Sequence, residues 1–76
     1  MSEIEFMDIF GDNLESLMND VGVGVNQLAR EINVSKAVIS RYINKQRIPS
    51  LKTFLNICIA LDCQPDDLVP LYEFIV

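Results

Sequence analysis

Apolar residues recur every three or four positions along this chain, in short runs that turn-forming residues separate. This spacing is typical of helices that bury one side, and the runs divide the chain into short helices with no convincing sheet. The first run follows the spacing of one helix face and consists of Phe10, Leu14, Leu17, Met18 and Val21. Asp8 is a suitable N-cap for this helix and Gly22 a suitable stop. We therefore expect residues 1–7 to be an N-terminal extension.

The next two runs predict a pair of short helices joined by a tight turn. The first carries Val25, Leu28, Ala29 and Ile32 on one side and is too short to be stable without neighbours. Asn33 tolerates the left-handed conformation that a tight turn requires. Ser35 then caps a third helix that runs to about residue 44.

Two further helices follow a loop over residues 44–49. Ser50 is a suitable cap for the fourth helix, and its expected buried side consists of Leu51, Phe54, Leu55, Cys58 and Leu61. Pro65 suits the first position of a fifth helix that ends near Pro70. The sequence predicts an all-α bundle of five helices, a single domain over residues 1–76 with an apolar tail at 71–76.

Composition excludes several classes of protein. Half of the residues are hydrophobic, which argues against a disordered chain, yet no run approaches the ~20 apolar residues that span a bilayer. The acidic N-terminus does not resemble a secretory signal, so we expect a cytoplasmic protein without a membrane partner. There is no His, and Cys58 and Cys63 are five positions apart, which excludes zinc and CxxC redox motifs. We expect two structural thiols and no metal.

Charge is unevenly distributed in the chain. The net charge is -5, but all six basic residues lie between positions 30 and 52: Arg30, Lys36, Arg41, Lys45, Arg47 and Lys52. Glu31 is the one acid between positions 21 and 61, so that segment carries 6 minus 1, or +5, and the ends carry the other ten acids. Such segregation predicts a basic binding face, with an ordinary solvated surface as the alternative.

The third helix has two distinct sides. At about 100° per residue, Val38, Ile39, Tyr42 and Ile43 share one arc. The opposite arc has no carboxylate and consists of Lys36, Ala37, Ser40, Arg41 and Asn44. These polar groups donate to phosphates and to the base edges of the DNA major groove, and Ala37 is small enough to touch a thymine methyl. A polar side without acids favours DNA binding over a merely solvated surface.

Residues 27–42, from Gln27 to Tyr42, resemble the helix-turn-helix of the Xre or lambda-repressor-like (Cro/C1-type) family. The resemblance continues through residues 44–50, 51–61 and 65–68, and so covers the chain from about Gly11 to Leu71. It implies a five-helix lambda-repressor-like fold in which the third helix reads DNA. The base contacts that it implies fall on Lys36, Ala37, Ser40 and Arg41. The implied phosphate contacts are Val25, Asn26, Asn44, Lys45, Gln46, Arg47 and Lys52.

Two positions depart from the family pattern. The usual Ser/Thr-Gln opening of the second helix is Gly24-Val25, which removes a cap and a phosphate-binding amide. The loop glycine that often follows Asn is Lys45, a change that we expect mainly to add a charge.

The function that we predict is sequence-specific binding of double-stranded DNA by a transcriptional regulator, a repressor that acts as a homodimer. The dimer face suggested by apolar residues comprises Ile59, Leu71, Tyr72 and Phe74, with packing into the core as the alternative. The rival function is a protein-binding module on the same fold, an antitoxin-like or anti-repressor partner. No His, Gly-rich phosphate loop or converging carboxylate pair suggests an enzyme, and we expect no cofactor or small-molecule ligand.

Overall fold

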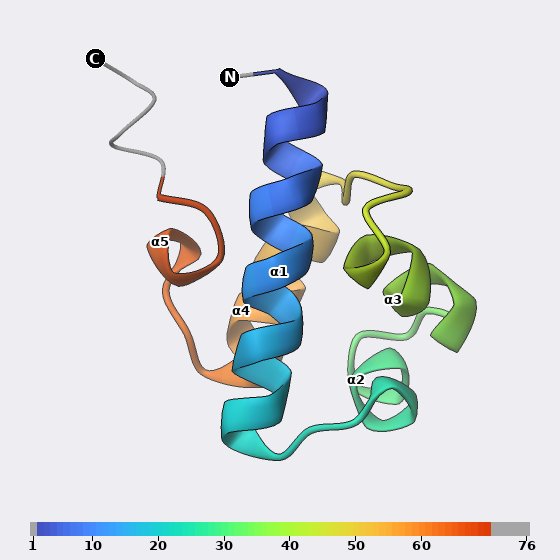
Figure 1. The fold of residues 1–76 in the computed structure, drawn as a ribbon. Helices are drawn as coiled ribbons and strands as arrows, with labels where there is room; N and C mark the ends of the chain where they lie inside the picture. Colours follow the sequence, from blue (N-terminus) through green and yellow to red (C-terminus); the bar gives the residue numbers. More distant parts are fainter. Residues whose placement is uncertain (1, 71–76) are drawn as a thin grey trace.

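The computed structural model describes residues 2–70 and contains five helices in that range, with no strand. They are α1 (Glu3–Val21), α2 (Val25–Glu31), α3 (Lys36–Ile43), α4 (Leu51–Leu61) and α5 (Pro65–Leu68). The long α1 runs through the middle and contacts α3, α4 and α5, while α2 packs against α3 and α4 (Figure 1). The predicted all-α, five-helix architecture is confirmed. None of the helices in residues 2–70 has the length and apolar character of a membrane span.

The start that we expected for α1 is wrong. The helix begins at Glu3, and its N-cap is Ser2, whose Oγ accepts a hydrogen bond from the Glu5 amide at 3.1 Å. Residues 3–7 therefore form the first turns of α1 rather than an extension, and Asp8 lies inside the helix. Ser2 followed three residues later by Glu5 is the spacing of a capping box, and Phe6 adds apolar surface that the early turns pack against the core. The predicted end is confirmed, because Gly22 is the C-cap with φ at 75°.

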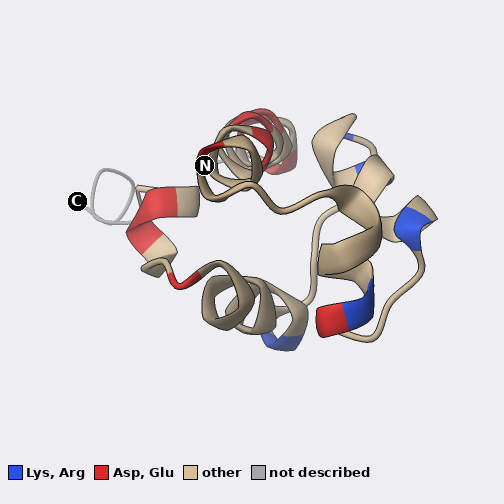
Figure 2. Ribbon diagram, turned by 90° about the horizontal axis from the view of Figure 1, so that it is seen from below, with Lys and Arg blue, Asp and Glu red and all other residues tan. Residues whose placement is uncertain are grey.

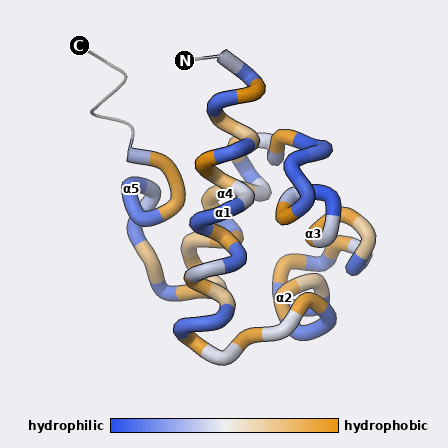
Figure 3. Tube along the Cα trace, viewed as in Figure 1, coloured by the Kyte–Doolittle hydropathy of each residue, from blue (hydrophilic) through white to orange (hydrophobic). Residues whose placement is uncertain are grey.

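One hydrophobic core joins all five helices. The side chains that are fully buried come from every helix and the segment after α5: Phe10, Leu14, Leu28, Ile39, Ile57, Leu68 and Val69. Phe10 also lies 5.8 Å from the ring of Phe54 and meets Tyr42 edge-on at 5.6 Å between ring centroids. In Figure 3 the tube of α1 alternates between hydrophilic and hydrophobic positions, as a helix with one buried side must.

The buried side of α4 differs from the prediction. Phe54, Cys58 and Leu61 are buried as expected, but Ile57 joins them and is fully buried. Leu51 and Leu55, which we expected on that side, are 73% and 43% exposed. Val21, the last expected core residue of α1, is also half exposed. Eight of the eleven residues of α4 are apolar, so tertiary packing rather than local pattern decides which side faces inward.

The connections match the expected turn chemistry at several points. Asn33 has φ at 58° between α2 and α3, and Ser50 caps α4 by accepting a hydrogen bond from the Thr53 amide at 3.2 Å. Pro65 is the first residue of α5. The Asn13 side-chain amide donates to the Leu68 carbonyl at 2.8 Å, which ties α5 to α1.

Candidate nucleic-acid interface

α2 and α3 form a helix-turn-helix whose inner side is fixed by a few buried residues. Leu28 and Ala29 of α2 are buried, as is Ile39 of α3, and the two helices are in contact. The Val34 amide donates to the Ala29 carbonyl at 2.9 Å, and the Val34 side chain packs against the core. These contacts set the angle between the two helices and leave the other side of α3 uncovered.

α1 holds the far end of α3. A methyl group added to Gly11 would lie 2.7 Å from the Tyr42 carbonyl oxygen and 3.1 Å from that of Ile43. Only a residue without a side chain permits this approach, so α1 packs directly on the last turn of α3. Buried Tyr42 completes the anchor, and burial raises the pKa of its hydroxyl above the ordinary value. The sequence reasoning missed Gly11, although a glycine inside a helical pattern is a signal of close packing.

The implied base-contacting residues lie on the uncovered side of α3. Lys36, Ala37 and Arg41 are exposed and Ser40 is half-buried, while Ile39 and Tyr42 are buried on the opposite side. Neither Lys36 nor Arg41 takes part in an ion pair with any residue in the range 2–70. α3 begins after Ser35, as expected, but the Ser35 side chain accepts no capping hydrogen bond. The helix therefore presents two free cations, a hydroxyl and a methyl group to solvent.

Most of the implied phosphate-contacting residues are also exposed. Asn26 lies in the first turn of α2, and Val25 beside it is half-buried. The loop after α3 and the first turn of α4 supply the others, all exposed: Asn44, Lys45, Gln46, Arg47 and Lys52. Figure 2 shows acidic residues along α1 and α5, and basic residues mostly around α2, α3 and this loop. The charge segregation in the sequence is thus a segregation in space.

Lys45 does more than add a charge to the loop. Its φ is 63°, which explains why glycine suits this position, and its Nζ lies 2.8 Å from Asp12 Oδ1 of α1. The hydrogen bond with Asp12, together with the nearby Asp8 and Glu15, raises the pKa of the Lys45 ammonium. Asp12 thus offsets the charge that Lys45 brings. The two residues are far apart in the sequence, and the sequence reasoning missed their contact.

The two thiols lie apart from this surface. Cys58 is buried and Cys63 half-buried, and both are free. Burial, with the neighbouring Cys58 thiol as the next cause, raises the pKa of Cys63 to about 11. A thiol of that kind stays protonated at neutral pH.

Comparisons with known proteins agree with this geometry. The sequence model of the Cro/C1-type HTH DNA-binding domain family matches residues 13–73 of this chain. The clp gene regulator ClgR of Corynebacterium glutamicum is similar in structure, with a TM-score of 0.81 and 25% identity over 86% of this chain and 69% of that one. The restriction-modification controller protein C.AhdI of Aeromonas hydrophila has a TM-score of 0.77 and 27% identity over 82% of this chain and 94% of its own.

A third similar structure shows the fold alone. The HTH_3 family transcriptional regulator of Vibrio cholerae has a TM-score of 0.83 at 19% identity, over 91% of this chain and 39% of its own. No curated protein sequence is a significant match to the chain.

Proposed function

Because this chain belongs to the Cro/C1-type family of helix-turn-helix DNA-binding domains, whose members are regulators and not enzymes, we propose that it acts in the cytoplasm as a transcriptional repressor, a homodimer that reads double-stranded DNA through α3. The observation that carries the proposal is the exposed side of α3. It bears cations and small polar groups without a carboxylate, directly opposite the side chains that anchor the helix in the core.

In the proposed mechanism α3 enters the major groove. Arg41 and Lys36 donate to guanine O6 and N7, Ala37 contacts a thymine methyl, and Ser40 hydrogen-bonds a base edge. The loop after α3, with Asn26 and Lys52, contacts phosphates and fixes the register of α3 on the duplex. The acids of α1 and α5 lie away from the outward side of α3, although Asp12 pairs with Lys45 at the edge of the surface, and this separation lets a chain of net charge -5 bind a polyanion.

A dimer follows from the small size of one such reading surface. A single α3 of eight residues contacts too few base pairs to define a unique site. Two copies on a two-fold axis place their α3 helices about 34 Å apart, one turn of DNA, and read a palindrome. Repression then results from occupation of a site that the transcription machinery needs. The printed names of ClgR and C.AhdI, a gene regulator and a controller protein, support gene control as the task.

The test is a titration of duplex DNA, first selected from a random pool and then measured at two salt concentrations. Arg41→Ala should weaken binding to the selected site about 5- to 150-fold, the equivalent of 1–3 kcal/mol, and relax the preference at one base pair. Arg47→Ala should weaken all sequences alike and lower the salt slope by about 0.9. If Arg41→Ala leaves the sequence preference unchanged, α3 is not the reading helix.

The same titration addresses the rival function. The acids of α1 and α5 suit a basic protein partner, whereas the acid-free side of α3 does not. A protein-binding module would show no salt-sensitive affinity for duplex DNA. Such a result would contradict the proposed function and leave the fold unchanged.

A further inference from the structure

The outward side of α4 is unusual for a helix on the surface of a charged protein. Its exposed residues are Leu51, Lys52, Leu55 and Ile59, and the three apolar side chains are 73%, 43% and 78% exposed. Positions 51, 55 and 59 are each four residues apart, so they form one stripe along the helix. We call these three residues the α4 stripe. A contiguous apolar surface of this kind marks a contact site.

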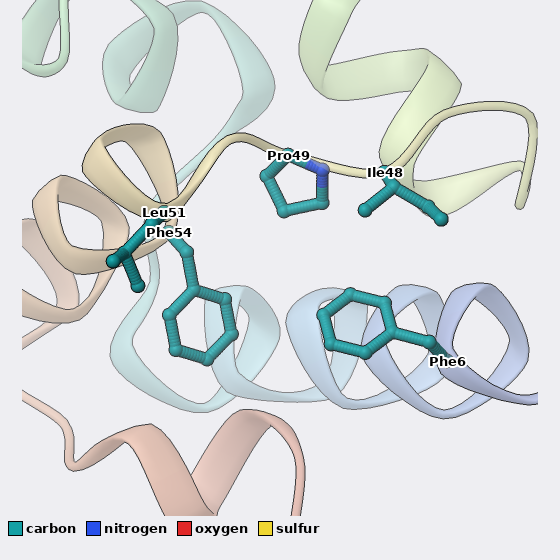
Figure 4. A pocket seen from close by; sticks show the side chains of 5 residues that line it. All are labelled: Phe6, Ile48, Pro49, Leu51 and Phe54. Carbon is teal, nitrogen blue, oxygen red and sulfur yellow. The ribbon is translucent and has the colours of Figure 1, made fainter. Parts of the chain in front are cut away.

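An apolar pocket adjoins one end of the α4 stripe. Leu51 lines it together with Phe6 of α1, Phe54 of α4, and Ile48 and Pro49 of the preceding loop (Figure 4). Its volume is about 290 Å³, and it is open to solvent. Ile59, the most exposed of the large apolar residues, lies at the other end of the stripe. Leu51 and Ile59 are eight positions apart, a distance of about 12 Å along a helix that rises about 1.5 Å per residue.

We propose that a second copy of this chain docks on the α4 stripe, with the two α4 helices antiparallel about a two-fold axis at Leu55. In this arrangement each Leu55 meets its symmetry mate. Each Ile59 reaches the partner's Leu51 and the mouth of the partner's pocket. The surface is complementary to itself only in the antiparallel sense, because the protruding residue and the pocket lie at opposite ends of one stripe. A two-fold contact of this kind closes and does not form fibres.

Charge favours the same occupant. Each chain carries a net charge of -5, so two copies repel one another through most of their surfaces. Residues 32–61, which include all of α4, contain no Asp or Glu. A contact through the α4 stripe therefore brings no carboxylate of one α4 against another, and Lys52 is the one charged residue of the helix. The antiparallel arrangement also places opposite ends of the two helix dipoles together.

This inference rests on the proposed function, since it gives the proposed dimer its surface. Of the residues that the sequence suggested for a dimer face, Ile59 belongs to the α4 stripe, whereas Leu71, Tyr72 and Phe74 lie outside the described residues. The stripe adds Leu51 and Leu55, for which the sequence pattern predicts a place in the core.

The first experiment measures the mass of the full chain by sedimentation. Ile59→Asp and Leu55→Asp should each weaken the dimer at least about 30-fold, as expected for a hot spot of an interface. Val21→Asp is the matched control, because Val21 is 50% exposed at the end of α1, away from the stripe, and should leave the mass unchanged. All three positions are exposed, and circular dichroism of each variant checks that the fold is intact.

The second experiment tests the antiparallel register by disulfide formation under mild oxidation. Leu55→Cys should cross-link two copies, because the two-fold axis brings position 55 to its own mate. Leu51→Cys alone should not, whereas the double variant Leu51→Cys/Ile59→Cys should. The wild-type chain, whose Cys58 is buried and Cys63 half-buried, gives the background. Equal cross-linking at positions 51 and 55 would overturn the register.

The outcomes separate this inference from the proposed function. A dimer whose mass is unaffected by Ile59→Asp would overturn the α4 stripe as its surface and leave the dimer standing. A monomer at about 100 μM, a hundred times a micromolar Kd, would overturn both the surface and the dimer. The Arg41 titration decides DNA binding in either case.

Discussion

Gly11 is the position where a single methyl group should disturb the anchoring of α3. In Gly11→Ala the new Cβ would lie 2.7 Å from the Tyr42 carbonyl oxygen, well inside van der Waals contact, and 3.1 Å from both the Ile43 oxygen and Lys45 Cγ. The carbonyls belong to the backbone, so α1 or the last turn of α3 must move. Overpacking of this kind destabilises the fold by about 1–3 kcal/mol, and the better helix propensity of Ala offsets up to about 1 kcal/mol of this loss. We expect a net loss of about 1–2 kcal/mol.

Thermal denaturation followed by circular dichroism measures this loss. For a domain of this size, 1 kcal/mol corresponds to about 4–8 °C in Tm, so Gly11→Ala should melt about 4–16 °C below the wild type. A Cβ at either of the two other glycines has no atom within 4 Å, so neither variant is overpacked, and Gly24 is the matched control. Gly24 is the N-cap of α2, where Ala is less favourable than Gly, so Gly24→Ala should lose about 0.5 kcal/mol. Gly22→Ala should lose about 1–2 kcal/mol, because φ there is 75°. A Gly11→Ala variant as stable as Gly24→Ala would refute the reasoning.

Three further predictions concern charge, capping and pH. Asp12→Asn releases Lys45 for a phosphate, so the affinity for DNA should rise and the salt slope of binding should steepen by about 0.9. Fluorescence anisotropy at two salt concentrations measures both quantities, and the absence of both changes would contradict the prediction. Ser50→Ala removes the cap of α4 and should cost about 1 kcal/mol in urea denaturation, whereas Ser35→Ala, which loses no capping hydrogen bond, should cost clearly less. The pKa of Cys63 is raised to about 11 from an ordinary 9, so its contribution to stability is present below pH 9 and is lost as pH rises through 11. Denaturation between pH 8 and 11 should therefore show a smaller alkaline loss for Cys63→Ala than for the wild type, and equal losses would contradict the assignment.

Local patterns predicted the elements in which polar and apolar residues separate cleanly. In α3 the two classes fall on opposite arcs, so both its buried side and its exposed side are as expected from the sequence. α4 offers no such contrast, because Lys52, Thr53 and Asn56 are its only polar residues. Which of its sides faces inward depends on contacts with α1, α2 and α5, and single-helix periodicity contains no information on those.

Contacts between residues far apart in the sequence are the other feature that the sequence alone did not predict. Asp12 and Lys45 are both ordinary surface residues by sequence, and their ion pair exists because Gly11 lets α1 approach the end of α3. The start of α1 was a different kind of error. Ser2 and Glu5 have the spacing of a capping box, but Asp8 is also a suitable N-cap and stands closer to the run that begins at Phe10.

The separation of α3 into a buried side and an outward side has a consequence for engineering. Ile39 and Tyr42 fasten the helix to the scaffold, and neither belongs to the outward set of Lys36, Ala37, Ser40 and Arg41. Lys36, Ala37 and Arg41 are exposed and therefore open to randomisation with little penalty in folding, whereas the half-buried Ser40 accepts fewer residue types. Under the proposed function, a library at the three exposed codons is the route to new operators on the same framework.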